Sequence, residues 1–200
     1  LISLPGFARI EAKLVPGTDP ATVGVLPFIE LLHAFPLQDG YDGLVLETYN
    51  GWESFLPIRY LKDKQTVLLL TYKGNTPSER PWPWFGGDIE PLAPFYAFDP
   101  GDPSPRFINA PKYGMIAATQ IKGIRAVNTE KRYAPFNAPD LSAKAKDGRA
   151  IFLQRCNGCH KGPGNVGGNV ADRPYPVIQA HANHNPEYFK RVVRHPDTFY

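Results

Sequence analysis

The sequence predicts an α+β protein in which a β-rich N-terminal domain with some helix (residues 1–132) precedes a small all-α domain (residues 142–200). Alternating or continuously apolar runs, which are typical of strands, lie in the first part, and apolar residues at helical spacing lie in the second. The segment between them, residues 133–141, holds two prolines and shows no periodicity. We therefore expect it to be an interdomain linker.

The first helix is expected within residues 21–35, where apolar residues recur at close to helical spacing and Pro27 lies near the start. A hairpin follows, because Leu44, Leu46 and Thr48 share one side of an alternating run that Asp-Gly and Asn-Gly turn pairs bound.

Residues 65–72 are apolar on both sides of the expected strand, a pattern typical of a buried strand. The proline-rich stretches 74–95 and 99–107 predict loops, since proline donates no hydrogen bond to a sheet. Residues 113–128 regain β-branched side chains and predict one or two closing strands. We expect a cluster of aromatic residues around these loops to pack on the β core, and the alternative is an interface hot spot. The cluster consists of Trp82, Trp84, Phe85, Phe95, Tyr96 and Phe98.

Charge is distributed unevenly along the chain: the net +3 divides into −2 for residues 1–141 and +5 for residues 142–200. The basic residues are scattered and form no nucleic-acid-binding motif, so a nucleic-acid partner is not expected. A basic segment of this kind is usually only a solvated surface, and the alternative is a docking face for an acidic protein partner, which is the partner we expect. No apolar run approaches the ~18–20 residues of a membrane span, so any membrane association is expected through a segment outside these residues.

The chemistry of the chain is concentrated in one short motif. Its only two cysteines, Cys156 and Cys159, are followed directly by His160 in the pattern C-x-x-C-H. This pattern is the attachment signature of c-type haem. The two sulfurs are suited to the two vinyl groups of haem, and the adjacent imidazole is suited to its iron.

The motif also fits three other interpretations. A Cys₂His₂ zinc site would recruit His181 and His184, whose spacing is shorter than usual for such sites. A thioredoxin-like dithiol would need a βαβ context and would give no reason for the histidine. A structural disulfide between the two cysteines is the simplest alternative.

Helices are expected on both sides of the motif. Residues spaced as one helical stripe lead into it, and Asp140 or Ser142 is suited to cap that helix. The stripe consists of Gly148, Phe152, Cys156 and Cys159. Residues 185–195 predict another helix, with asparagine as N-cap, proline at the first helical position and a His-Pro pair at the end.

Residues from about 141 to 200 resemble a class I cytochrome c domain. The first helix of that family reads G-x-x-x-F-x-x-x-C-x-x-C-H, and every position is matched from Gly148 to His160. The stretch from Asn185 to Pro196 also resembles the penultimate helix of the family.

The resemblance implies one covalent haem c, with Cys156 and Cys159 as thioethers and His160 as the proximal iron ligand. It implies that Phe152 packs against the haem. Pro163 is expected in the haem pocket, either lending its carbonyl to orient the imidazole or, as we favour, shaping a turn.

The second axial ligand is where this chain departs from the family, which supplies a methionine beyond the penultimate helix. We expect a continuation beyond Tyr200 to carry that methionine and the last helix. The alternatives are a histidine from an irregular stretch, His181 or His184, then His195, and finally Met115 from the other domain.

The N-terminal domain is similar, through its "DGY" turn at residues 39–41 and the late I-x-x-I strand at residues 121–124, to the sulfite-oxidase-like molybdopterin-binding fold. Such oxidases bind molybdenum through a cysteine thiolate. Residues 1–132 contain no cysteine and one histidine, His33. We therefore expect a cofactor-free accessory domain without molybdopterin.

These features predict an electron-transfer protein rather than an enzyme. Its expected function is single-electron transfer by a covalent haem in an extracytoplasmic redox chain, in bacteria the periplasm, with redox proteins as partners. The alternative is an accessory cytochrome subunit of a larger membrane-associated or multi-subunit redox complex.

Overall fold

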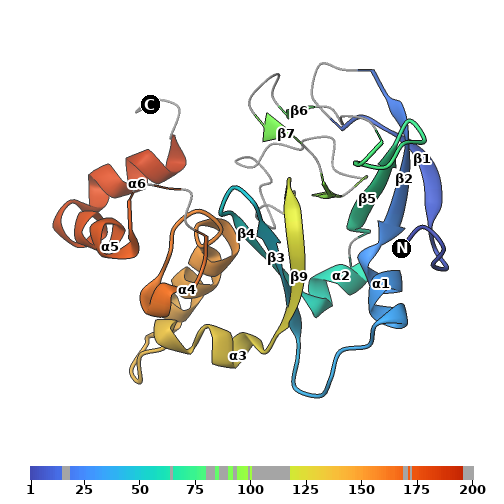
Figure 1. The fold of residues 1–200 in the computed structure, drawn as a ribbon. Helices are drawn as coiled ribbons and strands as arrows, with labels where there is room; N and C mark the ends of the chain where they lie inside the picture. The colour runs from blue at the N-terminus through green and yellow to red at the C-terminus, as the bar shows by residue number, and fades with distance from the viewer. Residues whose placement is uncertain are drawn as a thin grey trace.

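The computed structural model of the chain is mixed α and β, with its β-rich part N-terminal and a helical part after it (Figure 1). We call residues 1–127 the β-rich part and residues 129–195 the helical part. The structure describes residues 1–14, 19–63, 65–79, 84–85, 90–91, 94–98, 100, 118–168, 171 and 173–195. The predicted mixed class, with a β-rich N-terminal part, is confirmed.

Two antiparallel sheets form the β-rich part. The first has the order β1-β2-β5-β8, with β1 Ala8–Ala12, β2 Ala21–Pro27, β5 Val67–Tyr72 and β8 Tyr96–Phe98. The second has the order β4-β3-β9, with β3 Gly43–Thr48, β4 Glu53–Pro57 and β9 Ile121–Val127. A separate two-residue ladder joins β6 Trp84–Phe85 to β7 Glu90–Pro91.

The main core lies between the two sheets and the helices α1 Phe28–Ala34 and α2 Ile58–Asp63. Leucines from β2, β3, β4 and β5 meet there. A second cluster covers the other face of the first sheet. Five of the six residues of β5 are buried as a result, which confirms the predicted strand buried on both faces. Tyr96 and Phe98 are buried with their rings stacked, as expected for packing on the core.

The hairpin β3–β4 and the strand β9 confirm two further predictions. The helix expected within residues 21–35 is wrong in its first half. Val25 lies in β2, which pairs with β1 on one side and β5 on the other, and the helix begins at Phe28. Pro27 makes this boundary, because its ring is tolerated at the end of a strand and just before a helix but not within one.

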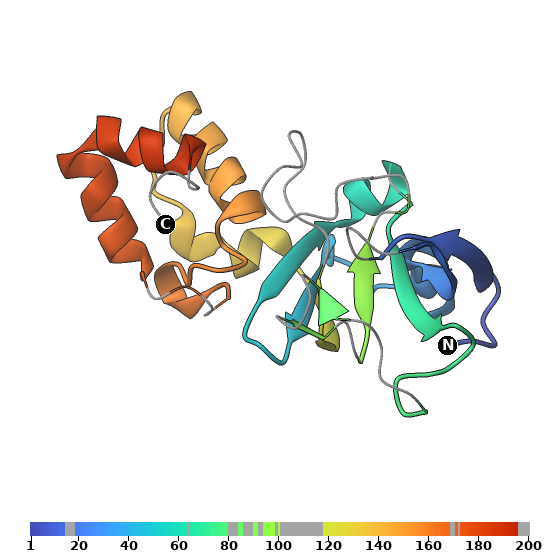
Figure 2. The ribbon, with the colours of Figure 1, turned by 90° about the horizontal axis from the view of Figure 1, so that it is seen from above.

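The helical part begins with α3 Thr129–Arg132 and the 3₁₀ turn η1 Ala134–Phe136, followed by α4 Ala143–Arg155. The 3₁₀ turn η2 Pro163–Asn165 precedes α5 Tyr175–His184 and α6 Pro186–Arg194 (Figure 2). Ser142 Oγ accepts a hydrogen bond from the Ala145 N–H, and Asn185 Oδ1 accepts one from the Tyr188 N–H. Both predicted N-caps are thereby confirmed, with Ser142 rather than Asp140 in the first position. Across the described ranges, no helix has both the length and the apolar character needed to cross a bilayer.

The expectation that His181 and His184 lie in an irregular stretch is wrong. Both belong to the last turn of α5. The helix starts directly after Pro174 with a second proline in its first turn, where proline costs no intrahelical hydrogen bond.

The first residues of the expected linker, residues 133–136, are packed between the two parts. Tyr133 is only 1% exposed, and its ring meets that of Phe55 in β4 edge-on at 5.1 Å between centroids. On the helical side, Arg149 Nη2 donates to the Tyr133 carbonyl at 3.2 Å. The chain is thus anchored to both parts where it passes from one to the other.

Tyr133 makes stability fall at alkaline pH. Burial raises the pKa of its phenol to about 12, against about 10 in an unfolded chain. The folded state holds this proton more tightly, so its contribution to the free energy of unfolding is complete below pH 10 and declines as the pH rises towards 12. We expect Tyr133→Phe to flatten this decline in urea denaturation followed between pH 9 and 11.5. The exposed Tyr49→Phe is the control, and an equal decline in both variants would contradict the assignment.

Candidate functional site

The C-x-x-C-H motif forms a tight turn at the end of α4. Cys156 is the C-cap of the helix, and its N–H donates to the Phe152 carbonyl at 2.8 Å. The N–H groups of Cys159 and His160 both donate to the Cys156 carbonyl, at 3.1 and 2.9 Å. The two cysteines and the histidine are therefore held within one turn, although Cys159 lies beyond the helix rather than on its stripe.

A buried asparagine between the cysteines fixes the loop that follows. Asn157 is 4% exposed, and its side-chain amide donates to the carbonyls of His160 and Val166 at 3.2 and 2.9 Å. The backbone carbonyl of Asn157 accepts a hydrogen bond from the Gly168 N–H at 2.9 Å. Residues 160–168 are thus tied to the motif at several points, and burial makes each of these bonds costly to lose.

The two cysteines are thiols rather than a disulfide, and both are half-buried. Burial, with a smaller effect of the neighbouring Cys156, raises the pKa of the Cys159 thiol to about 11. This site favours an uncharged sulfur, whereas reactive dithiols have a lowered pKa that favours the thiolate.

His160 is oriented by a backbone carbonyl. Its Nδ1 lies 2.8 Å from the carbonyl oxygen of Arg173. Since a carbonyl only accepts, Nδ1 carries the proton, and Nε2 of the neutral ring keeps a lone pair available to a metal. The carbonyl that orients the ring is therefore that of Arg173, not that of Pro163. Pro163 instead starts η2, and its carbonyl accepts from the Val166 N–H at 3.4 Å, in agreement with the turn role we favoured.

An aromatic cluster lies against the motif helix. Phe152, Phe136 and Tyr175 meet pairwise with ring centroids 5.3 to 5.8 Å apart. Gly162, in the loop after the motif, lies so close to the Phe136 ring that a Cβ there would collide with it. The predicted haem-contact residue Phe152 thus has two aromatic neighbours from distant segments.

Four residues of this site were missed by sequence reasoning: Asn157, Arg173, Phe136 and Tyr175. Asn157 could have been identified from the sequence, because it lies between the two cysteines of the motif. The others depend on the path of the loop and on the packing of a segment that reads as linker.

The structure does not assemble the alternative zinc set. Cys156 and Cys159 are described, as are His181 and His184, yet no group of three or more metal-ligating His, Cys, Asp or Glu side chains forms within the described ranges. His181 instead lies near Tyr188, 6.2 Å between ring centroids. Met115 lies outside the described residues.

The helical part buries little apolar surface of its own. From residue 134 onward, Leu153, 8% exposed, is the one buried hydrophobic side chain among the described residues, and neither α5 nor α6 contains a buried residue. On α4, Ile151 is 55% exposed, and a Cβ built on Gly148 would meet no atom within 4 Å. Among the described residues, this segment therefore buries little apolar surface for its size.

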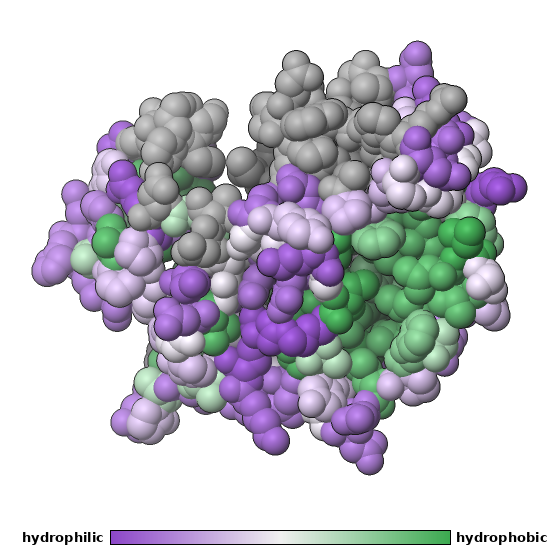
Figure 3. Space-filling view, viewed as in Figure 1, coloured by the Kyte–Doolittle hydropathy of each residue, from purple (hydrophilic) through white to green (hydrophobic). Residues whose placement is uncertain are grey.

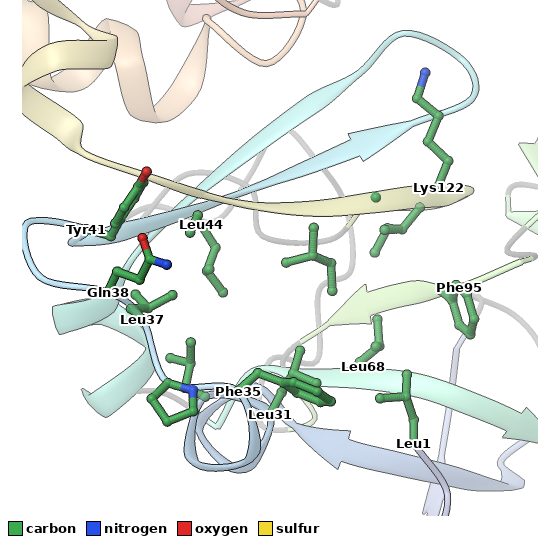
Figure 4. Close-up of a pocket in the computed structure, with 16 residues that line it drawn as sticks. Leu1, Leu31, Phe35, Leu37, Gln38, Tyr41, Leu44, Leu68, Phe95 and Lys122 are labelled. Carbon is green, nitrogen blue, oxygen red and sulfur yellow. The ribbon is translucent and has the colours of Figure 1, made fainter.

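An apolar pocket of about 620 Å³ lies in the β-rich part, away from the motif. Figure 3 shows the surrounding surface as a hydrophobic face, and Figure 4 shows side chains from α1, β3 and β5 along the pocket wall. The lining residues labelled in Figure 4 include Leu31, Phe35, Leu44 and Leu68. Lys122, the charged side chain in its lining, extends away from it.

Comparison with known proteins gives no relative: no family model, no curated protein and no solved structure matches this chain.

The reactivity of Cys159 tests the thiol environment directly. In haem-free Cys156→Ser protein, burial still raises the thiol pKa, so we expect the rate of alkylation by iodoacetamide to rise about tenfold per pH unit up to at least pH 10. In urea the rate should level off near pH 9, the ordinary range of a thiol. A plateau below pH 8 in the folded protein would instead identify an activated thiol, as expected of a redox cysteine.

Proposed function

We propose that this chain is an electron-transfer protein that carries one covalent c-type haem. Cys156 and Cys159 hold the haem as thioethers, and His160 binds its iron through Nε2. The observation that carries this proposal is the hydrogen bond from His160 Nδ1 to the Arg173 carbonyl, because it fixes the tautomer in which Nε2 can bind a metal.

The cysteines support the same proposal. Each thiol adds across a vinyl double bond to give a thioether, which is uncharged. The half-buried turn that raises the pKa of Cys159 disfavours a thiolate and imposes no such penalty on a thioether. The pairing of this pKa shift with a motif that includes His160 favours haem attachment over a redox dithiol.

The sparse core of the helical part gives further support. The described residues after residue 134 bury one large hydrophobic side chain, Leu153, while Phe152 and Tyr175 remain only partly buried. A haem macrocycle would add the apolar surface that these helices need to pack upon.

The haem supplies the redox chemistry by taking up and releasing one electron. The chain supplies ligation through His160, covalent retention through the cysteines, and a docking surface. We propose redox proteins as partners and an extracytoplasmic location, because c-type haem is attached on the outer side of the bacterial membrane. The β-rich part, which has no cysteine, is proposed to bind neither molybdenum nor molybdopterin.

A second candidate function is that of an accessory cytochrome subunit in a larger redox complex. The hydrophobic face around the apolar pocket supports it, since exposed apolar patches commonly mark protein interfaces. The native mass of the protein purified from its own host distinguishes the two: a monomer supports the first candidate, and a stable complex supports the second.

Covalent attachment is the central test. After expression with a haem-attachment system, we expect the wild-type chain to retain one haem through acid-acetone extraction and to give a c-type pyridine haemochrome spectrum. Cys156→Ala/Cys159→Ala should lose all covalent haem because no thioether can form. His33→Ala, a histidine substitution outside the motif, should retain it. Release of the haem from the wild type, or one zinc per chain, would overturn the proposal.

The partner proposal predicts a salt-dependent reaction rate. Lys144 and Lys146 are exposed in the first turn of α4, the helix that leads into the motif. With an acidic redox partner, we expect stopped-flow reduction to slow as ionic strength rises, and the double reversal Lys144→Glu/Lys146→Glu to slow it about tenfold at low salt. Lys13→Glu, an exposed lysine in the β-rich part, is the matched control. Rates that are independent of salt would contradict steering by these charges.

A further inference from the structure

The turn between the two cysteines is packed against the β-rich part. A Cβ built on Gly158 would lie 2.8 Å from a ring carbon of Trp52 and 2.9 Å from the Glu53 carbonyl oxygen. Trp52 stands in the loop that joins β3 to β4, and Glu53 is the first residue of β4. The loop therefore covers one side of the C-x-x-C turn at van der Waals distance, which only a glycine at position 158 allows.

A backbone hydrogen bond joins the same two segments. The Glu53 N–H donates to the Gly158 carbonyl at 3.2 Å, which connects β4 to the peptide just before Cys159. A Cβ on Gly168 would collide with this carbonyl and would come within 3.1 Å of the Glu53 nitrogen. The backbones of Gly158 and Gly168 thus lie in direct contact with the backbone of Glu53 at the start of β4.

The covering loop is itself held in place. The indole Nε1 of Trp52 donates to Ser54 Oγ at 2.7 Å, so the orientation of the ring is fixed. The Trp52 carbonyl accepts from Thr48 Oγ1 at 2.8 Å, and its N–H donates to Asn50 Oδ1 at 3.1 Å. Residue 52 is therefore presented by a loop with little freedom to move away.

Charged contacts brace the strand end. The Glu53 carboxylate pairs with Arg132 in α3 and lies 3.9 Å from Arg125 in β9. Arg132 is in turn adjacent to Tyr133, which contacts both parts. The contact at Gly158 is thus one of several that fix the helical part to the second sheet.

We propose that the β3–β4 loop is a structural component of the haem site, with Trp52 as a positioning residue that shields the thioether edge from water. This inference rests on the proposed function, and it assigns a role to the β-rich part: by limiting water access, that part raises the reduction potential of the haem. Oxidised haem carries one more positive charge than reduced haem, and water stabilises that charge. Removing the indole therefore favours the oxidised state and lowers the potential.

The test compares four forms of the full chain: wild type, Trp52→Ala, Trp52→Phe and Tyr49→Ala. Tyr49 is an exposed aromatic residue of the same loop and serves as the matched control. Haem content is measured first, and then the reduction potential by spectroelectrochemistry. We expect a lower potential in Trp52→Ala, a smaller shift in Trp52→Phe and no shift in Tyr49→Ala. Haem loss confined to Trp52→Ala would also support positioning.

A readout on haem-free protein separates this inference from the proposed function. The Glu53 amide is bonded to Gly158, so its hydrogen exchange should accelerate at least tenfold in Trp52→Ala and stay unchanged in Tyr49→Ala. If Trp52→Ala does not fold, Ser54→Ala, which frees the indole N–H, carries the test with a smaller shift of the same sign. Equal potentials and equal exchange in all folded variants would overturn the inference. Absence of haem from the wild type would overturn the proposed function instead.

Discussion

The side-chain amide of Asn157 holds together the candidate site. Its two donated bonds bring the carbonyls of His160 and Val166 to one point, and its backbone carbonyl secures Gly168. The loop that follows the motif leads to Arg173, whose carbonyl accepts the hydrogen bond of His160 Nδ1. Because Asn157 is buried, no water replaces these bonds if they break, and the loop and the histidine orientation are expected to be lost together.

The two parts of the molecule differ in how they are stabilised. The β-rich part has two hydrophobic clusters, one on each face of its first sheet. The helical part has N-caps, an aromatic cluster and contacts to the second sheet, but little buried apolar surface among its described residues. Attachment to the sheet through Tyr133 and Gly158 compensates for part of this deficit, and a prosthetic group would compensate for more.

Local signals in the sequence predicted the elements whose stability is local. The Asn-Gly pair predicted the β3–β4 hairpin, and the unbroken apolar run predicted β5. Ser142 and Asn185 predicted the starts of α4 and α6. The prediction of a helix around Val25 is wrong because the apolar spacing of this segment fits a helix as well as a strand. Pairing with β1 and β5 on its two sides stabilises the strand.

The candidate site was predictable only where the motif itself carries the chemistry. The pattern names Cys156, Cys159 and His160, but not the carbonyl that orients the histidine, which comes from 13 residues farther along the chain. The contact of Trp52 with Gly158 joins segments more than a hundred residues apart, and no local pattern encodes it. Such contacts follow from the relative placement of the two parts.

The pair Asn157-Gly158 also has a consequence for the chemical ageing of the protein. An asparagine followed by glycine deamidates readily, because the glycine nitrogen attacks the side-chain carbonyl carbon and closes a cyclic imide. That attack requires the side chain to rotate over its own backbone. Here the Asn157 amide donates to two carbonyls and Gly158 packs against the Trp52 indole. The folded state therefore protects the asparagine from deamidation. Each opening of the loop therefore exposes the motif to an irreversible change that leaves an acid at its centre.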